Sequence, residues 1–170
     1  MYQKNYQYTH DIDWFCVFKN RPIHLASNGG LLPATYNIKD IVKIQHIVSG
    51  MPTICDYTLN ESYVKGVVKQ LSMTHLEDLS EDEEKLLYPE SMNFMGKQLS
   101  IKEKAYCWSF IEMAQKGFYS YDRSVDDNMY YLVASPIGSV INVPQEIQRF
   151  DFDVNVLNGP IDFFTIIKST

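Results

Sequence analysis

The sequence predicts an α+β fold, in which a mostly antiparallel sheet packs against about four helices from the middle of the chain. Two runs rich in aromatic and branched residues predict a hairpin near the N-terminus. Residues 38–117 show helical spacing of apolar residues together with helix-capping patterns. The last third returns to short runs that predict about four more strands. Strands and helices that are segregated along the chain in this way are typical of the α+β class.

The N-terminal hairpin is predicted from the runs "DIDWFCVF" and "PIHLASN", with a turn between them. If Lys19 pairs with Pro22, Asp13 faces Asn28. His24 then lies about 13 Å from Asp13 along the hairpin, at roughly 3.3 Å of rise per residue. One face of this hairpin is apolar and is predicted to be the core side. It consists of Ile12, Trp14, Cys16, Phe18, Ile23 and Leu25.

Four helices are predicted in the middle of the chain, the first over about residues 38–49. The pattern Ser/Thr-x-x-Glu is typical of a capping box, and it opens the other three helices at Thr58, Ser80 and Ser100. The last helix is polar along one narrow stripe and apolar around the rest, so it is predicted to be the central helix of the fold. The polar stripe consists of Lys102, Ser109, Glu112 and Lys116.

The predicted C-terminal strands are "MYYLVAS", "SVINV", "FDFDVNVL" and "IDFFTIIK". The third run alternates apolar and polar residues, as a strand with one wet face does. Asn158-Gly159 predicts a tight turn before the fourth, because both residue types tolerate positive φ. The whole chain, 1–170, is predicted to form a single domain, because 170 residues suit one core.

The composition is that of an acidic globular protein, with 45% hydrophobic residues and a net charge of -6. Nucleic acid is disfavoured as a partner, because its phosphates are bound by clustered Lys and Arg. No signal peptide pattern is present, and no run approaches the roughly 20 apolar residues of a membrane helix, so no membrane partner is expected. The three cysteines are widely spaced and predict free thiols. Together these features predict a cytoplasmic protein.

The segment "HLASNGGLLP" places Asn28-Gly29-Gly30 between two apolar runs, where glycines either cradle a phosphate or turn the chain. A phosphate loop leads directly into a helix, so that free N–H groups converge on the anion. Here residues 31–36 intervene and no Gly-Lys-Ser/Thr follows. The segment is therefore predicted to be a chain reversal.

The segment "THDID" contains residue types that bind divalent ions. In a strand Asp11 and Asp13 point to one side and His10 to the other, so no metal site is predicted. A modest polar group of Asp11, Asp13 and Asn28 remains at the open end of the hairpin. With His10, these are the candidate catalytic residues, and a solvated sheet end is the alternative interpretation.

Motifs of common enzymes are absent from the sequence: it contains no HExxH, paired CxxC, GxSxG or Walker loop. No cofactor is predicted. Cys16 falls on the core side of the hairpin and Cys107 in the apolar arc of the central helix, so both are predicted to be buried, inert thiols.

Acidic residues crowd the stretch between residues 77 and 90. Those that follow Ser80 either complement the helix dipole or attract a basic partner. Tyrosines that follow the central helix either pack in the sheet or rim a binding surface. The predicted partner-binding residues are Glu81, Asp82, Glu83, Glu84, Tyr119, Tyr121 and Arg123.

Two main functions are compatible with these patterns. The leading hypothesis is a non-enzymatic, cytoplasmic protein-binding or regulatory module with a basic protein as its partner, for example an immunity-type inhibitor of a basic toxin. The competing hypothesis is a small hydrolase or metal-dependent enzyme at the open end of the hairpin. A third is a small-ligand pocket between the central helix and the sheet.

Overall fold

A computed structural model of the chain describes residues 7, 10–18, 20–30, 32, 38–73, 76, 79–88, 94, 98–138 and 142–150. Contacts divide the chain into two compact units. We call Met1–Asn60 with Phe110–Thr170 the sheet unit, and Glu61–Ser109 the helical unit. Within the described residues, no helix combines the length and hydropathy of a membrane-spanning segment.

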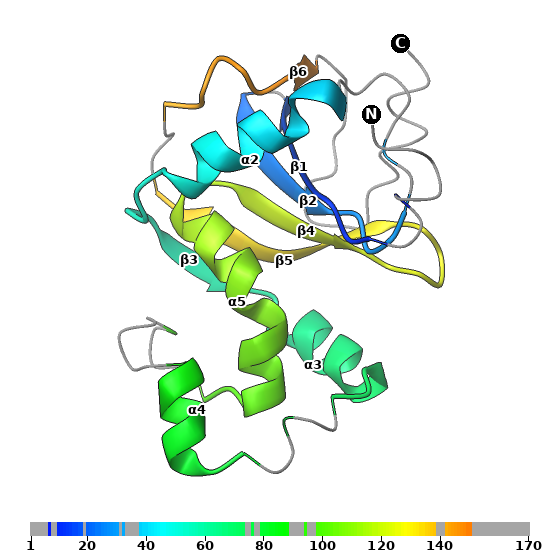
Figure 1. Cartoon of the computed structure of the whole chain (residues 1–170), viewed down its shortest axis with the longest axis vertical. Helices are drawn as coiled ribbons and strands as arrows, with labels where there is room; N and C mark the ends of the chain where they lie inside the picture. Colours follow the sequence, from blue (N-terminus) through cyan, green and yellow to red (C-terminus); the bar gives the residue numbers. More distant parts are fainter. Residues whose placement is uncertain are drawn as a thin grey trace. The chain divides into compact units, whose positions relative to one another are not determined.

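The sheet unit contains one mixed sheet of six strands in the order β3-β5-β4-β2-β1-β6 (Figure 1). The strands are β1 (Asp13–Phe18), β2 (Arg21–Ala26), β3 (Asp56–Leu59), β4 (Tyr119–Arg123), β5 (Tyr130–Ile137) and β6 (Arg149–Phe150). The α+β class is confirmed, but the prediction of a mostly antiparallel sheet is wrong. β2 is parallel to β4, and β1 is parallel to β6. A long crossover separates β2 from β4 in the chain, and such connections allow parallel neighbours, which a tight hairpin does not.

The layout also differs because β3 and β4 form where the sequence pattern predicted no strand. Thr58, the predicted cap of the second helix, lies in β3. The backbone N–H of Asn60 donates to the carbonyl of Val133 at 2.8 Å, and its side-chain amide donates to that of Leu132 at 3.0 Å. These bonds tie Asn60 to β5, so the helix begins only at Glu61.

The C-terminal predictions are tested in part. "MYYLVAS" corresponds to β5, and Phe150, the first residue of the third run, lies in β6, while the rest of that run lies outside the described residues. Residues 142 and 143 of "SVINV" are not in a strand, and the rest of that run lies outside the described residues. "IDFFTIIK" and Asn158-Gly159 also lie outside the described residues.

The register of the N-terminal hairpin differs by two residues from the predicted one. Phe15 pairs with His24, and Asp13 pairs with Ala26 rather than with Asn28. The connection between the strands therefore consists of residues 19 and 20 alone, and Asn20 has a φ of 62°. Two-residue hairpin connections favour residues that tolerate positive φ, and Asn is one of them. The predicted distance between His24 and Asp13 was wrong because this register places His24 opposite Phe15, two residues from Asp13.

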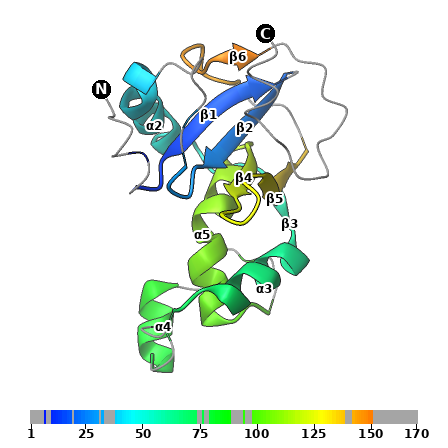
Figure 2. The same cartoon turned by 90° about the vertical axis from the view of Figure 1, so that its right-hand side faces the viewer.

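Both faces of the hairpin are buried. The predicted core face is confirmed, since its residues lie in one apolar cluster with Tyr121 and Tyr130. The opposite face is covered by α2 (Ile41–Ser49), which follows the 3-10 helix η1 (Ile38–Asp40). Ile44 and Val48 of α2 pack against Phe15 of β1, and α2 lies over β1 in both views (Figures 1 and 2).

The long helix α5 (Ile101–Gln115) begins in the helical unit and ends in the sheet unit. Lys116, which directly follows α5, was predicted to be solvent-exposed but is only 3% exposed. Its Nζ donates to the carbonyl of Ser49 at 3.1 Å and lies 2.7 Å from a carboxylate oxygen of Glu112. This buried cation is therefore paired, and it ties the ends of α2 and α5 together.

The helical unit consists of α3 (Glu61–Gln70), α4 (Glu81–Leu87) and the first part of α5. Two of the three predicted capping boxes are confirmed. The backbone N–H of Ser80 donates to Glu83, and the N–H of Glu83 donates back to the Ser80 hydroxyl. Ser100 and Glu103 form the same pair of bonds at the start of α5.

Candidate functional site

Three polar side chains form a hydrogen-bonded row across neighbouring strands of the sheet unit. Nε2 of His24, on β2, lies 3.0 Å from Oδ1 of Asp13 on β1. Nδ1 of His24 lies 2.6 Å from Oγ of Ser120 on β4. Ser120 pairs directly with His24 in the sheet. Asp13, on β1, is the diagonal neighbour of His24, and long side chains span the distance between diagonal neighbours. We call this row the Asp13–His24–Ser120 network.

The partners of His24 determine where its proton resides. An ionised carboxylate accepts hydrogen bonds but donates none, so Nε2 of His24 must hold a proton and donate it to Asp13. In the neutral imidazole, Nδ1 then accepts from the hydroxyl of Ser120. Burial acts to raise the pKa of Asp13, but the hydrogen bond and charge of His24 outweigh it and hold that pKa below its usual value.

The network has the residue types of an acyl-transfer triad, in which serine is the nucleophile. The order of exposure is the reverse of that in an active triad, where the serine is accessible to substrate and the aspartate is buried. Ser120 is 0% exposed and His24 1%, whereas half of the Asp13 side chain is exposed. The rings of Phe15 and Phe110 cover the imidazole, with centroids 5.2 and 6.0 Å away. A substrate carbonyl cannot reach Ser120 in this arrangement, so the network is a structural link between three strands.

Asp11 and Asn28 meet at the open end of the hairpin, as the sequence predicted. Oδ1 of Asp11 accepts from the backbone N–H of Asn28 at 2.6 Å and from the hydroxyl of Ser27 at 3.4 Å. Asp13 instead joins the network. Throughout the described part of the chain, no group of three or more His, Cys, Asp or Glu side chains could hold a metal ion. His10, which is exposed, therefore forms no such group with these aspartates.

The Asn28-Gly29-Gly30 segment is confirmed as a turn. Asn28 and Gly29 have φ values of 43° and 69°, in the left-handed region that glycine and asparagine tolerate best. Gly30 has a separate role. A Cβ there would lie 2.2 Å from a guanidinium nitrogen of Arg123, so glycine leaves room for this side chain against the turn. The side chain of Asn28 also donates to the carbonyl of Arg123 at 2.9 Å.

The two hairpin aspartates predict opposite contributions to acid stability. The low pKa of Asp13 means that its stabilising effect is present above pH 3.8 and is lost as the pH falls through its folded-state pKa. Burial raises the pKa of Asp11 despite its bond from Asn28, so protonation of Asp11 relieves a cost. We expect Asp13→Asn to flatten the loss of stability as the pH falls below 3.8, and Asp11→Asn to steepen the loss as the pH falls to 3.8 from above, in urea unfolding at each pH.

The comparison of the two variants provides the control, because each replaces one carboxylate by an amide of the same size in the same segment. If both variants changed the pH profile in the same direction, the assignment of opposite pKa shifts to these aspartates would be wrong.

The cysteines are free thiols within the described residues, as predicted. Burial raises the pKa of Cys16, which is 1% exposed. Burial, with a smaller contribution from Glu103, raises the pKa of Cys107 to about 12. Neither thiol ionises at neutral pH, so neither is an activated nucleophile. Cys55 is half-buried.

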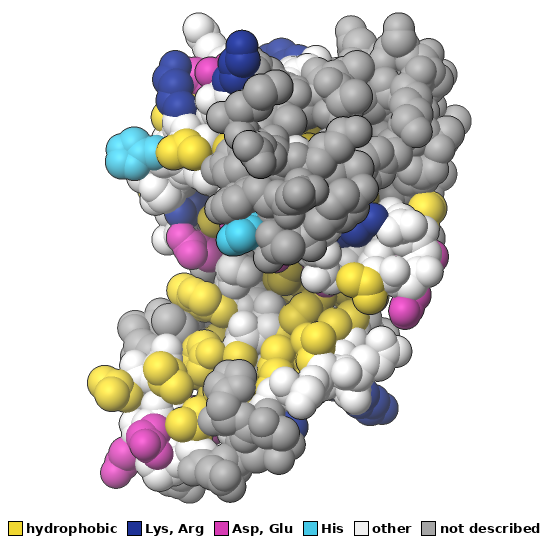
Figure 3. All heavy atoms as spheres, turned by 45° about the vertical axis from the view of Figure 1, so that its right-hand side comes forward, with side chains coloured by type: hydrophobic (Ala, Val, Ile, Leu, Met, Phe, Trp, Pro, Cys, Tyr) yellow, Lys and Arg dark blue, Asp and Glu magenta, His cyan; other side chains and the backbone are white. Residues whose placement is uncertain are grey.

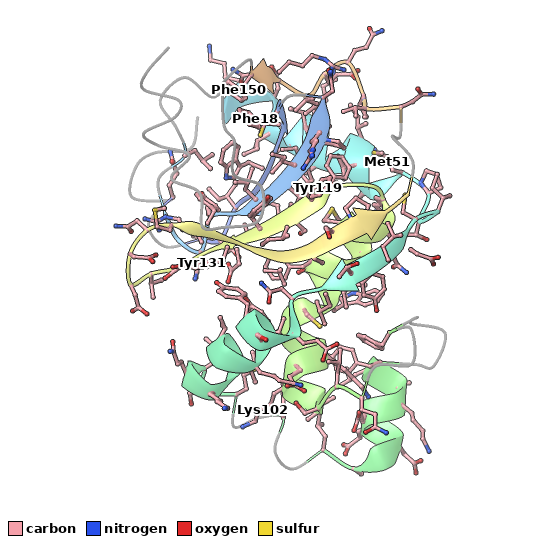
Figure 4. All side chains as sticks on the ribbon, turned by 180° about the vertical axis from the view of Figure 1, so that it is seen from behind. Phe18, Met51, Lys102, Tyr119, Tyr131 and Phe150 are labelled. Atoms are coloured by element: carbon pink, nitrogen blue, oxygen red, sulfur yellow. The ribbon has the colours of Figure 1, made fainter. Side chains whose placement is uncertain are left out.

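The predicted partner-binding residues belong to both units. Tyr121 is a core residue, 0% exposed, and does not present a surface. Tyr119 packs partly buried against the same core, with the guanidinium of Arg21 5.4 Å from its ring centroid (Figure 4). Arg123 donates to the side chain of Asn128. The tyrosines thus pack in the sheet, the alternative interpretation of their spacing.

The acidic residues lie in α4 of the helical unit. Glu83 closes the capping box, and its bonds with Ser80 lower its pKa. Glu84 pairs with Lys104 of α5. Asp82 is exposed, and Glu81 is the first residue of the helix. Part of this acidic run therefore has an internal structural role, and Asp82 faces solvent.

Sequence reasoning missed His24 and Ser120 as members of one network. The predicted pairing of Lys19 with Pro22 also leaves a two-residue connection that contains Asn20, so no local signal distinguished it from the observed register, which brings His24 next to Asp13. No local signal pairs β2 with β4. Comparisons of the chain with models of protein families, with curated protein sequences and with solved structures found no match in any of the three.

Proposed function

We propose that this chain is a non-enzymatic protein-binding module, that α4 provides its binding surface, and that its partner is a basic protein. The observation that supports this most directly is the exposure of two adjacent leucines on an acidic helix. Leu86 is 82% exposed and Leu87 48% exposed. In Figure 3 apolar side chains lie at the surface beside acidic ones in the lower part of the view, where α4 lies.

The two kinds of side chain on α4 suit two steps of association. Burying a leucine side chain contributes about 1.5–3 kcal/mol, so the exposed pair offers substantial binding energy to a partner with an apolar face. Exposed carboxylates such as Asp82 attract a basic partner over distance and accelerate the encounter. A basic partner with an apolar patch complements both features.

The competing hydrolase hypothesis has less support. Its residues at the hairpin end are engaged in bonds within the chain, and Asp13 belongs to a network whose serine is buried. Catalysis by Ser120, which that hypothesis did not include, would need the sheet to open around this buried side chain. The binding surface on α4 requires no rearrangement.

The test is affinity capture from cells that contain the natural partner, with the captured protein identified and its affinity then measured in purified form. We expect a basic protein whose affinity falls at least about tenfold when Leu86 and Leu87 are both replaced by serine. Asp82→Asn should slow association and reduce its dependence on salt.

A matched control replaces exposed apolar residues of the sheet unit, Val42→Ser with Val125→Ser, which are 60% and 67% exposed. These variants should bind as tightly as the unmodified chain. Equal losses for both pairs of substitutions, or a captured partner without a basic surface, would contradict α4 as the binding surface.

A further inference from the structure

The helical unit contains a pocket of about 600 Å³ between α3 and the start of α5. This volume is within the range of small-molecule sites, roughly 300–1,000 Å³. Three lysines line it: Lys65 and Lys69 from α3, and Lys102 from α5. Figure 4 labels Lys102 at the first turn of α5, beside α3.

The charge of this pocket is opposite to that of its surroundings. Residues 61–109 contain six lysines and nine carboxylates. The pocket is lined by three of these lysines but by a single carboxylate, that of Glu103. Oε2 of Glu103 already accepts the backbone N–H of Ser100 at 2.7 Å. The formal charge of the lining is therefore positive, close to the charge that a phosphate dianion would neutralise.

The placement of the lysines on α3 is unfavourable without an anion. Lys65 and Lys69 are four residues apart, so they lie on one side of the helix and repel each other. Lys65 is partly neutralised by Glu61, one turn earlier, at 3.6 Å. That pair is exposed and weak, with half of the Lys65 side chain in solvent. An anion in the pocket would lower the repulsion between the two ammonium groups.

The rest of the lining includes apolar side chains, namely Val68, Leu71 and Met73. A free inorganic ion would leave these groups in contact with water. A ligand that joins an anionic group to an apolar body would use both parts of the lining. An ammonium group binds phosphate as a point charge. A site with several ammonium groups therefore favours a doubly charged phosphate over a singly charged carboxylate as its ligand.

We propose that this pocket binds a small organic phosphate, with its phosphate group among Lys65, Lys69 and Lys102 and its apolar part against Val68 and Met73. The site lies apart from the exposed leucines of α4, and it does not depend on the proposed partner. It adds a small-molecule ligand to the proposed binding function.

The experiment is a titration of the full chain with phenyl phosphate, followed by the NMR signal of the Met73 methyl group. Inorganic phosphate and phenol serve as probes of the two halves of the ligand. We expect saturable binding of phenyl phosphate, weaker binding of inorganic phosphate and the weakest binding of phenol. Lys69→Gln should weaken phenyl phosphate binding at least about fivefold, the effect of one pair of unit charges at about 4 Å in water.

Two further variants separate a built site from general attraction. Lys85→Gln removes an exposed lysine of α4 that does not line the pocket, and it should leave the affinity unchanged. Glu61→Gln should tighten binding, because it removes the carboxylate that competes for Lys65. The proposal is overturned if the Met73 signal does not move, if Lys85→Gln weakens binding as much as Lys69→Gln, or if phenol binds as tightly as phenyl phosphate.

Discussion

Replacing Trp14 with alanine is expected to lower the free energy of unfolding by about 3–5 kcal/mol, the range for truncation of large aromatic residues in a core. Trp14 is 0% exposed, and its ring meets that of Tyr130 edge to face at a centroid distance of 6.3 Å. Removing it leaves a cavity between β1 and β5 side chains that the surrounding strands cannot close. Urea unfolding followed by far-UV circular dichroism measures the loss.

The chain offers a matched control, because its second tryptophan is Trp108 of the helical unit. Trp108 is half-buried and lies 6.3 Å from the ring of Phe94. Trp108→Ala should therefore cost less than Trp14→Ala. A loss within about 0.5 kcal/mol for Trp14→Ala, the usual range for surface positions, would contradict the assignment of this hairpin face to the core.

Replacing His24 with leucine is expected to produce the second large loss of stability. The buried hydroxyl of Ser120 would lose its partner, and an unsatisfied buried group costs about 1–3 kcal/mol. Adding Ser120→Ala to His24→Leu also removes the hydroxyl that has lost its hydrogen-bond partner. The double variant should therefore be more stable than the sum of the single losses predicts, with a coupling of about 0.5–3 kcal/mol.

Trp14 fluorescence in a Trp108→Phe background reports on unfolding of the sheet unit alone, since the chain has two tryptophans. The control cycle combines His24→Leu with Ser27→Ala. Ser27 is equally buried but bonds to Ile12 and Asp11 rather than to the imidazole. Additive losses for His24 and Ser120 would show that the network contributes no linked stability.

Local patterns predicted a substantial part of this molecule. Capping boxes at Ser80 and Ser100 marked two helix starts, because side chains three residues apart satisfy the first N–H groups without help from the rest of the fold. The third box, at Thr58, failed because β5 offered the backbone around Asn60 stronger partners. Tertiary pairing thus overrode a local preference.

Only one contact of the candidate site could be predicted from the sequence. Asp11 and Asn28 are close in the chain reversal, so sequence reasoning could place them together. Ser120 could not be placed beside His24, because these residues are brought together by a parallel pairing that links distant segments. The lysine pocket was also beyond reach, since α3 and the start of α5 are separated in sequence by α4.

By itself, the sequence determined the α+β class, the turn at Asn28-Gly29 and the apolar face that contains Trp14 and Cys16. The spacing of apolar residues along a strand and the backbone conformations open to glycine are local properties, so they do not depend on how the strands are arranged. The tertiary structure alone decided the hairpin register, the parallel pairing of β2 with β4 and the burial of His24. A slip of two residues keeps every side chain on its original face, so the apolar pattern accepts both registers equally. Only packing against α2, α5 and β4 distinguishes them.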